Sequence, residues 1–256
     1  MDKISLKTKE QIALMVKGGN ELSRIRDLLV SEVKPGVRTI ELDRLAESRI
    51  LAFGGKPSFK TVRDYRYATC ISVNDEVVHG IPSQRVIKEG DVVKVDLGMI
   101  YSGLHTDTTW TVLVHNKESR IKNLEVEKFL KIGEETLAGA IKITKPGGRI
   151  GKISQIIEAK IKSAGYFPVE ILTGHGVGLS LHEDPVIPQV LLGKVEETPE
   201  IVPGMTLAIE VIYNLGTKEV LLKKDSWTIA SVDGKISATF EKSIAVEKNG
   251  SIVLTP

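Results

Sequence analysis

The second half of the sequence repeats the order of the first, and this repeat restricts the folds open to the chain. A gapless alignment joins the segment that starts at Lys34, KPGVRTIELDRLAESRI, to the segment that starts at Lys145, KPGGRIGKISQIIEAKI. Such a repeat predicts two related halves, about 1–120 and 121–256, around a pseudo-twofold axis. Chance similarity between amphipathic helices is the alternative, but it does not account for the shared Lys-Pro-Gly turn.

Within each half, helical patterns come first and strand patterns follow. Apolar residues recur at three- and four-residue steps after Thr8, and Thr8 and Gln11 have the spacing of a capping box. The predicted helices cover residues 8–33, 39–54, about 125–143, and a segment that ends at about 164; the clearest predicted strands cover 92–97 and 109–114. This order predicts an α+β fold.

Two further pairings of segments, in the predicted strands, place acidic residues opposite one another. IKEGDVVKVDLG aligns with IVPGMTLAIEVI, so that Asp96 faces Glu210, and DTTWTV can be laid over EKSIAV, so that Asp107 faces Glu241. Asp96 and Glu210 interrupt apolar strands, where an unpaired carboxylate is unfavourable or loses its charge. For any single acid, a Lys or Arg partner or a half-exposed strand is an equal alternative. Four acids in matching positions favour a metal ion.

Three of the five histidines lie in segments typical of turns and strand ends, where binding sites gather. His79 lies in VVHGIP, His175 in TGHGVG and His182 in LHEDP. We expect structural or surface roles for His105 and His115, although His105 is close to one of the paired acids. Donors rich in carboxylates, with few imidazoles and no thiolate, suit Mn, Fe, Co or Zn, and four acids suffice to bridge two ions.

The charge balance disfavours some classes of partner. The chain has 35 Lys and Arg against 33 Asp and Glu, a net charge of +2, which gives no electrostatic reason to expect DNA or an anionic membrane as a partner. Cys70 is the single cysteine, so an intramolecular disulfide is excluded. No secretory signal and no apolar run near the ~18 residues of a membrane helix is found. We therefore expect a soluble cytoplasmic protein.

Six segments resemble, in order, the signature segments of methionine aminopeptidases: VVHGIP, VKVDLG, HTDTTWTV, TGHGVGLSLHEDP, PGMTLAIEV and SATFEKSIAV. The resemblance spans nearly the whole chain. It implies the pita-bread (creatinase/aminopeptidase) fold, a pseudo-twofold α+β arrangement with a central antiparallel sheet covered by helices, as a single catalytic domain over 1–256. It also implies removal of the initiator Met from nascent polypeptides, preferentially before a small second residue, by a metal-bridged hydroxide that attacks the scissile carbonyl.

The resemblance assigns the metal ligands at the matching positions. It implies that Asp96 chelates one divalent ion, that Asp107 and Glu241 bridge both ions, and that His175 and Glu210 complete the other site. Glu210 would also carry a proton from water to the leaving amine. The implied cofactor is therefore a pair of Co, Mn, Fe or Zn ions.

Substrate contacts are also implied by the resemblance. His182 would bond the substrate carbonyl oxygen and His79 the amide nitrogen of the bond that is cut. The methionine pocket would be formed by Tyr65, Cys70 and Trp227, since sulfur and aromatic edges favour a thioether. For Tyr65 and Trp227, plain core packing is the alternative.

Some positions extend or depart from the family pattern. Asn74 and Ser237 match positions that help hold a monovalent cation in some relatives. Leu181, beside the pocket, stands where an aromatic residue is usual. Lys242 replaces a common His, and Val211 a frequent Pro. None of these three departures removes a ligand, so we expect activity to be retained.

The spacing of the segments resembles that of type I enzymes. His79 comes too early for the N-terminal domain of prolidases, and the short stretch from Glu210 to Glu241 leaves no room for the helical insert of type II enzymes. We expect a monomer that acts on the N-terminal Met of nascent peptides and contacts the ribosome transiently. The alternatives are a non-catalytic ribosome- or protein-binding member of the same fold, and an aminopeptidase of broader specificity.

Overall fold

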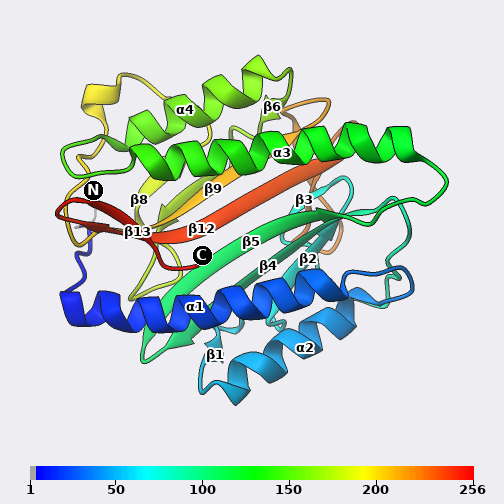
Figure 1. Ribbon diagram of the computed structural model, residues 1–256, viewed down its shortest axis with the longest axis horizontal. Coiled ribbons are helices and arrows are strands. Elements are labelled where there is room, and N and C mark those ends of the chain that lie inside the picture. Colours follow the sequence, from blue (N-terminus) through cyan, green and yellow to red (C-terminus); the bar gives the residue numbers. More distant parts are fainter. Residues whose placement is uncertain (1–3) are drawn as a thin grey trace.

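The computed structural model describes residues 4–256 and has helices packed on a long twisted sheet (Figure 1). Its α-helices are α1 (Lys9–Glu32), α2 (Thr39–Ala52), α3 (Arg120–Ile143) and α4 (Ile150–Ser163). The predicted capping box of α1 is present, with Thr8 and Gln11 bonding each other's backbone N–H groups. The predicted start of α3 at about 125 is wrong by about a turn, because Ile121 and Leu124 are exposed and blur its amphipathic pattern.

The two helix pairs repeat each other in length and position. α1 and α3 have 24 residues each, and α2 and α4 have 14 each. The shift in sequence that carries Lys34 onto Lys145 superposes the bounds of both pairs. The same shift carries β1 (Lys56–Pro57) onto β6 (Phe167–Pro168). The pseudo-twofold α+β fold predicted from the repeat is therefore confirmed.

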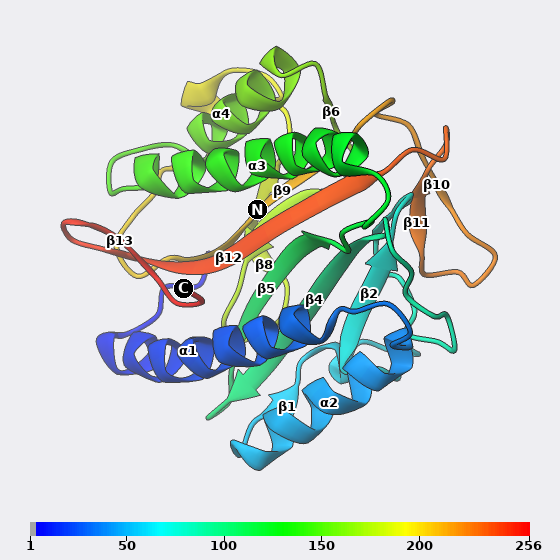
Figure 2. The same ribbon diagram turned by 45° about the vertical axis from the view of Figure 1, so that its right-hand side comes forward.

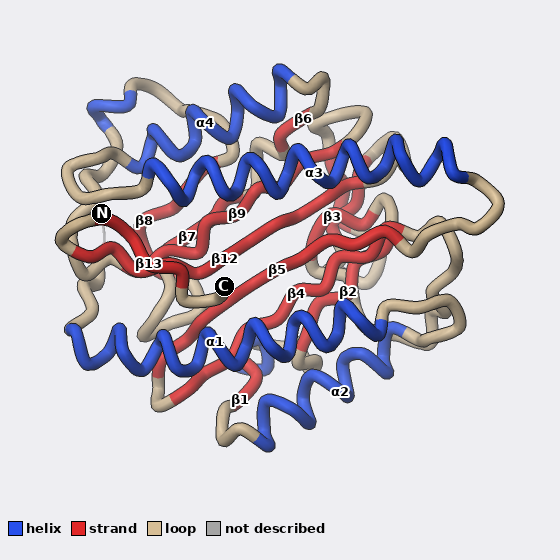
Figure 3. The backbone as a smooth tube through the Cα atoms, in the orientation of Figure 1, coloured by secondary structure: helices blue, strands red, loops and turns tan. Residues whose placement is uncertain are grey.

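The main sheet has ten strands, and its path runs β1-β4-β5-β12-β9-β7-β8. β2, β6 and β13 pair with β4, β9 and β12 beside this path, and all of these described pairs are antiparallel. The halves join where β5 and β12 lie side by side (Figure 3). The bounds are β2 (Thr69–Val73), β4 (Val92–Tyr101), β5 (Leu104–Leu113), β7 (Thr173–Gly176), β8 (Glu183–Pro188), β9 (Thr206–Asn214), β12 (Ser237–Glu247) and β13 (Gly250–Val253).

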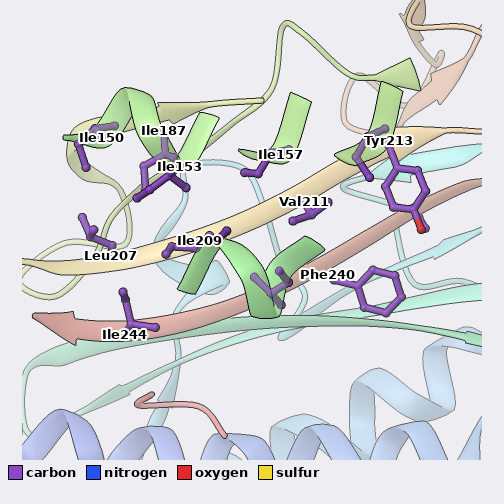
Figure 4. Packing of buried hydrophobic residues seen from close by; sticks show 14 of the residues in the cluster. Ile150, Ile153, Ile157, Ile187, Leu207, Ile209, Val211, Tyr213, Phe240 and Ile244 are labelled. Atoms are coloured by element: carbon purple, nitrogen blue, oxygen red, sulfur yellow. The ribbon is translucent and has the colours of Figure 1, made fainter. Parts of the chain in front are cut away.

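Side chains alternate between the two faces of this sheet, and the four helices cover one face (Figure 2). On β4, Val93, Val95 and Leu97 pack in a core with α1 and α2. On β9 and β12, the residues that pack against α3 and α4 include Ile209, Val211, Phe240 and Ile244 (Figure 4). The residues between these point to the opposite face, and they include Lys94, Asp96, Glu210 and Glu241.

A small second sheet lies at one edge of the molecule. It has the order β10-β11-β3 and consists of β3 (Glu76–Val78), β10 (Val220–Leu222) and β11 (Ile229–Ser231). Two 3-10 turns complete the assigned elements, η1 (Phe59–Thr61) and η2 (Val195–Glu197). The sequence did not predict this sheet, because such short strands show no readable alternation. Within the described residues 4–256, no helix is both long and apolar enough to cross a membrane.

Candidate active site

Acidic and imidazole side chains from both halves converge on the face of the sheet that the helices leave free. Ligand atoms of Asp107 on β5, His175 on β7 and Glu241 on β12 lie within 4.8 Å of one another. His175 Nε2 is 3.3 Å from Glu210 Oε1 of β9. These four residues therefore form one cluster, although Asp107 and Glu241 come from opposite halves of the sequence.

Thr109 of β5 links Asp96 to this cluster. Its Cα is in register with Asp96 of β4 on one side and with Glu241 of β12 on the other. Its hydroxyl lies 2.8 Å from Asp96 Oδ1 and 2.8 Å from Glu241 Oε2. Glu241 is in turn in register with Glu210. Because register partners share a face of the sheet, all five residues that the sequence predicts as metal ligands come together.

Two glycines let His175 approach the neighbouring strands closely. A Cβ at Gly174 would lie 2.6 Å from Ala208 O, and one at Gly176 would lie 2.4 Å from Asp184 O. His175 Nδ1 is 2.8 Å from the carbonyl oxygen of Gly176, so Nδ1 carries the hydrogen and donates it. The lone pair of Nε2 is then free and faces the acids, as a metal ligand requires.

Burial and mutual repulsion act on the carboxyl groups of the cluster. Burial raises the pKa of Asp96 to about 7. Burial and the charge of Glu241 raise the pKa of Asp107 well above its usual range, and burial together with neighbouring acids does the same for Glu210 and Glu241. Burial lowers the pKa of His175 to about 4, so its ring is neutral at neutral pH. Nearby positive charge would restore the ionised carboxylates.

A divalent cation fits this donor set. Glu241 Oε1 is buried and has no hydrogen-bond partner. Within residues 4–256, no Lys or Arg forms an ion pair with any of the four acids. In the described part of the chain, these acids therefore lack the basic partner that was the alternative to a metal ion. Carboxylate oxygens with one imidazole suit Mn, Fe, Co or Zn, the metals that the sequence predicts.

His182 and His79 lie at the mouth of the cavity above the acids, and both side chains are exposed. The His182 ring packs edge to face on the His175 ring, with 4.5 Å between their centroids. His79 directly follows β3 and has a φ of 58°. The next residue, Gly80, packs so tightly on β2 that a Cβ there would lie 2.6 Å from Ile71 O. The backbone at His79 is thus held in one conformation.

A mostly apolar pocket opens onto the cluster. Tyr65, Cys70 and Leu181 are buried in its wall, and Trp227 is half-buried beside them. The Tyr65 and Trp227 rings pack edge to face with 4.9 Å between centroids, and the Tyr65 hydroxyl lies 3.2 Å from Cys70 Sγ. All four predicted pocket residues therefore line one cavity. Phe59 also lines it and was not predicted, because the short η1 turn has no periodicity to reveal it.

The profile of metallopeptidase family M24 matches residues 13–248. The chain belongs to this family. Methionine aminopeptidase 1 of Bacillus subtilis (strain 168) is 39% identical to it over 252 residues, which cover 98% of this chain and 99% of the relative. The methionine aminopeptidase of Clostridium perfringens (strain 13 / Type A) is 38% identical over 252 residues, with 98% of each chain covered.

Solved structures agree with this assignment. The methionine aminopeptidase of Thermotoga maritima superposes on this M24 protein with a TM-score of 0.93, at 37% identity and 99% coverage of both chains. The prolidase of Pyrococcus furiosus gives a TM-score of 0.76 at 26% identity, and the match covers 98% of this chain but 65% of the prolidase. The predicted resemblance to methionine aminopeptidases and the pita-bread fold are confirmed.

Other residues singled out from the sequence lie away from the acids of this M24 protein. His105 is buried, with Nδ1 3.1 Å from Ser58 Oγ, and His115 is exposed, so neither joins the cluster. Lys242 points to the helix side, where its Nζ lies over an aromatic ring of β5. Val211 is buried in the core on the same side. These departures from the family pattern therefore leave the ligands untouched.

The N-terminal segment of this M24 protein braces the loop that carries His182. The Lys7 side chain is 1% exposed and forms an ion pair with Glu183, the residue after His182. The Lys7 backbone N–H also donates to Gly204 O at 2.7 Å. Sequence reasoning missed this contact, because a lysine in a polar N-terminal segment is normally solvated.

Asn74 and Ser237, predicted to help hold a monovalent cation, do lie together. Oxygen atoms of both residues accept hydrogen bonds from Lys94 Nζ. These oxygens therefore already hold an ammonium group. No signal in the sequence marked Lys94, since a lysine on a strand normally points to solvent.

Proposed function

We propose that the chain is a type I methionine aminopeptidase, which removes the initiator Met from nascent polypeptides when the second residue is small. The observation that carries this proposal is that the five predicted ligands and the mostly apolar wall around Tyr65 and Cys70 line the same pocket. The relatives named above support it, since they share this length and bear that name.

The predicted ligand roles divide the cluster into two metal positions. We assign Asp96 to one ion, Asp107 and Glu241 to both, and His175 and Glu210 to the other. When bound, such ions activate a water molecule and polarise the scissile carbonyl. The close contact of His175 Nε2 with Glu210, and the position of Glu241 between the strands of both halves, support this division.

Glu210 is the residue we assign to proton transfer. Its Oε1 lies 3.3 Å from His175 Nε2 within the acid cluster, where the carboxylate is placed to take up a proton from the attacking water and then deliver it to the leaving amine. His182, exposed at the cavity mouth, is suited to donate a hydrogen bond to the substrate carbonyl oxygen as negative charge develops there. His79, on its fixed backbone, is suited to contact the amide nitrogen.

The pocket supports the preference for methionine. Cys70 and the ring edges of Tyr65 and Trp227 offer a soft surface to a thioether. A wider hollow leads outward from His182 and His79, and Ile171, Leu179 and Val186 line it. We assign the hollow to the residues that follow the methionine.

We further propose that the enzyme is a cytoplasmic monomer, acts as a single domain and meets its substrates at the ribosome. Its single cysteine, Cys70, is buried in the pocket wall as a free thiol. There it forms part of the soft surface that we assign to the methionine thioether. The near-neutral charge fits a transient ribosome contact better than stable binding to RNA.

The test measures methionine release from Met-Ala-Ser by protein stripped of metal and then reloaded with Mn, Fe, Co or Zn. We expect no release without metal, and a rate about 10³-fold lower for Glu210→Ala than for the wild type. Glu219→Ala changes an exposed glutamate in the same half and serves as the matched control. Activity that resists both chelation and Glu210→Ala would refute the proposal, and metal binding without hydrolysis would favour the non-catalytic alternative.

A further inference from the structure

Lys94 is a fully buried lysine that the chemistry proposed above does not use. It lies on β4, two residues before Asp96 and on the same face of the sheet, and is 1% exposed. Burying an ammonium group is unfavourable unless protein oxygens replace the water molecules that it loses.

Three oxygen atoms make this replacement. Lys94 Nζ donates hydrogen bonds to Asn74 O at 2.8 Å, to Ser237 O at 3.0 Å and to Ser237 Oγ at 3.0 Å. The Ser237 hydroxyl is itself within 3.2 Å of Asn74 O and 3.0 Å of Glu76 O, so its own hydrogen is directed at a carbonyl oxygen. Its lone pairs remain for Lys94. Three acceptors require three N–H donors, which only the charged ammonium form provides.

The surroundings of this group resemble the coordination of a small cation by neutral oxygens. None of the three acceptors is a carboxylate. The three hydrogen bonds favour the charged form of Lys94.

The ammonium group joins three elements beside the active site. Asn74 lies in the turn between β2 and β3 and has a φ of 60°, and Ser237 begins β12, four residues before Glu241. Lys94 reaches both from β4, although β5 lies between β4 and β12 in the sheet. The turn leads through β3 directly to His79.

We propose that the Lys94 ammonium is a built-in structural cation that holds the β2–β3 turn against β4 and β12 and thereby positions His79. The positioning of His79 rests on the function proposed above, whereas the structural role does not. Asn74 and Ser237, which match positions that help hold a monovalent cation in some relatives, direct their oxygens at this side chain instead. The wild-type protein therefore needs no Na⁺ or K⁺ at this place.

The first test compares unfolding temperatures of the divalent-metal-free protein in KCl, NaCl and choline chloride at one ionic strength. Lys94→Ala keeps the oxygens and opens a space for an ion. In choline we expect it to unfold about 4 °C or more below the wild type, and to regain about half of that loss in K⁺ or Na⁺. Lys94→Met fills the space with an apolar chain and is expected to lose stability without recovery. The wild type should behave alike in all three salts.

The second test follows methionine release by the metal-loaded proteins. In choline, Lys94→Ala should lower kcat for Met-Ala-Ser about tenfold, with a smaller change in KM, because His79 acts on the bond being cut. The cation that restores stability should also restore kcat. Lys88→Ala, at an exposed lysine just before β4, is the matched control and should change neither quantity.

Each outcome decides one part of the proposal. A Lys94→Met protein as stable as the wild type, or a Lys94→Ala protein that ignores the cations, overturns the structural cation. A wild type stabilised by K⁺ or Na⁺ over choline also overturns it, and that measurement needs no variant to fold. Recovery of stability without recovery of kcat overturns the positioning of His79. If the wild type releases no methionine, the proposed function fails and the unfolding comparison still stands.

Discussion

The two halves of the molecule share one framework but bring different groups to the site. Matching strands carry acids at matching positions, Asp96 on β4 with Glu210 on β9 and Asp107 on β5 with Glu241 on β12. The helices above them superpose by one common shift in sequence. The symmetric part of the molecule therefore provides a cradle of four carboxylates.

The halves differ in what surrounds that cradle. The second half contributes His175 on β7 and His182 in the loop that follows, whereas the first half contributes His79. Tyr65 and Cys70 of the first half form the apolar wall together with Leu181 and Trp227 of the second. Lys94 on β4 aligns with Ala208 on β9, so only the first half supplies a buried ammonium group at this position. The symmetric positions therefore supply the four acids of the cluster, whereas His175 and the residues to which we assign substrate contacts have no symmetric counterparts.

Breaking the symmetric cradle should have the largest effect. Glu241→Gln removes the charge of an acid that we assign to both metal positions, and we expect methionine release to fall about 10³-fold or more, because ion binding and water activation are lost together. Metal analysis of the purified variant should show fewer bound ions than in the wild type. A variant with full metal content and full activity would show that Glu241 is not a ligand.

Removing a histidine that only the second half supplies should lower activity less. His182→Ala leaves the five ligands in place, and we expect a roughly 10²-fold lower kcat from the loss of one donor to the substrate carbonyl. The metal content and the unfolding temperature should stay unchanged, since the side chain is exposed. The matched control is His115→Ala, and a similar fall in that variant would remove the special role of His182.

Removing the contact between Lys7 and Glu183 should lower activity less than removing His182. Lys7→Met breaks the ion pair with Glu183, frees the loop next to His182, and should lower kcat about tenfold. It should also lower the unfolding temperature, because a half-buried carboxylate loses its partner. Lys9→Met changes an exposed lysine of the same segment and should do neither. Equal effects of the two changes would contradict a specific brace.

The cradle should also be visible as a pH dependence of stability in the metal-free protein. Burial raises the pKa of Asp96 to about 7, above its value in the unfolded chain, so its contribution to stability is complete at low pH and is lost as the pH rises through about 7. Asn cannot ionise. The unfolding temperature of the wild type minus that of Asp96→Asn should therefore fall by about 4 °C from pH 4.5 to pH 8. A difference independent of pH would contradict the raised pKa.

The smallest effect is expected in the pocket wall. Leu181→Phe adds volume beside Tyr65 and Cys70, and should lower kcat/KM for Met-Ala-Ser by about fivefold through a higher KM. Rates on Leu-Ala-Ser, measured in parallel, should fall at least as much. An unchanged KM would place the methionine side chain elsewhere.

The sequence predicted the symmetric part of the molecule well. The capping box of α1, the helix pairs and the paired acids depend on periodicity, on local hydrogen bonds and on a repeat, which are all visible in one chain. The family segments added His79 and His182, both of which lie at the cavity mouth.

The asymmetric part was much harder to predict. Lys94 and Ser237 are far apart in the sequence, as are Lys7 and Glu183, so nothing local relates them. A buried lysine has the same sequence pattern as a solvated one, because the oxygens that surround it come from distant turns. The small sheet that leads to His79 is likewise built from strands too short to show a period.

The Thr109 hydroxyl lies within hydrogen-bond distance of Asp96 and of Glu241 but carries one hydrogen. It can donate to one carboxylate at a time. In the metal-free protein the other contact is satisfied when the second carboxyl group supplies a proton of its own, and these two carboxyl groups would have to give up that proton to hold a cation. We therefore expect metal loading to release protons, which a pH-sensitive dye would register, and the affinity for metal to weaken as the pH falls.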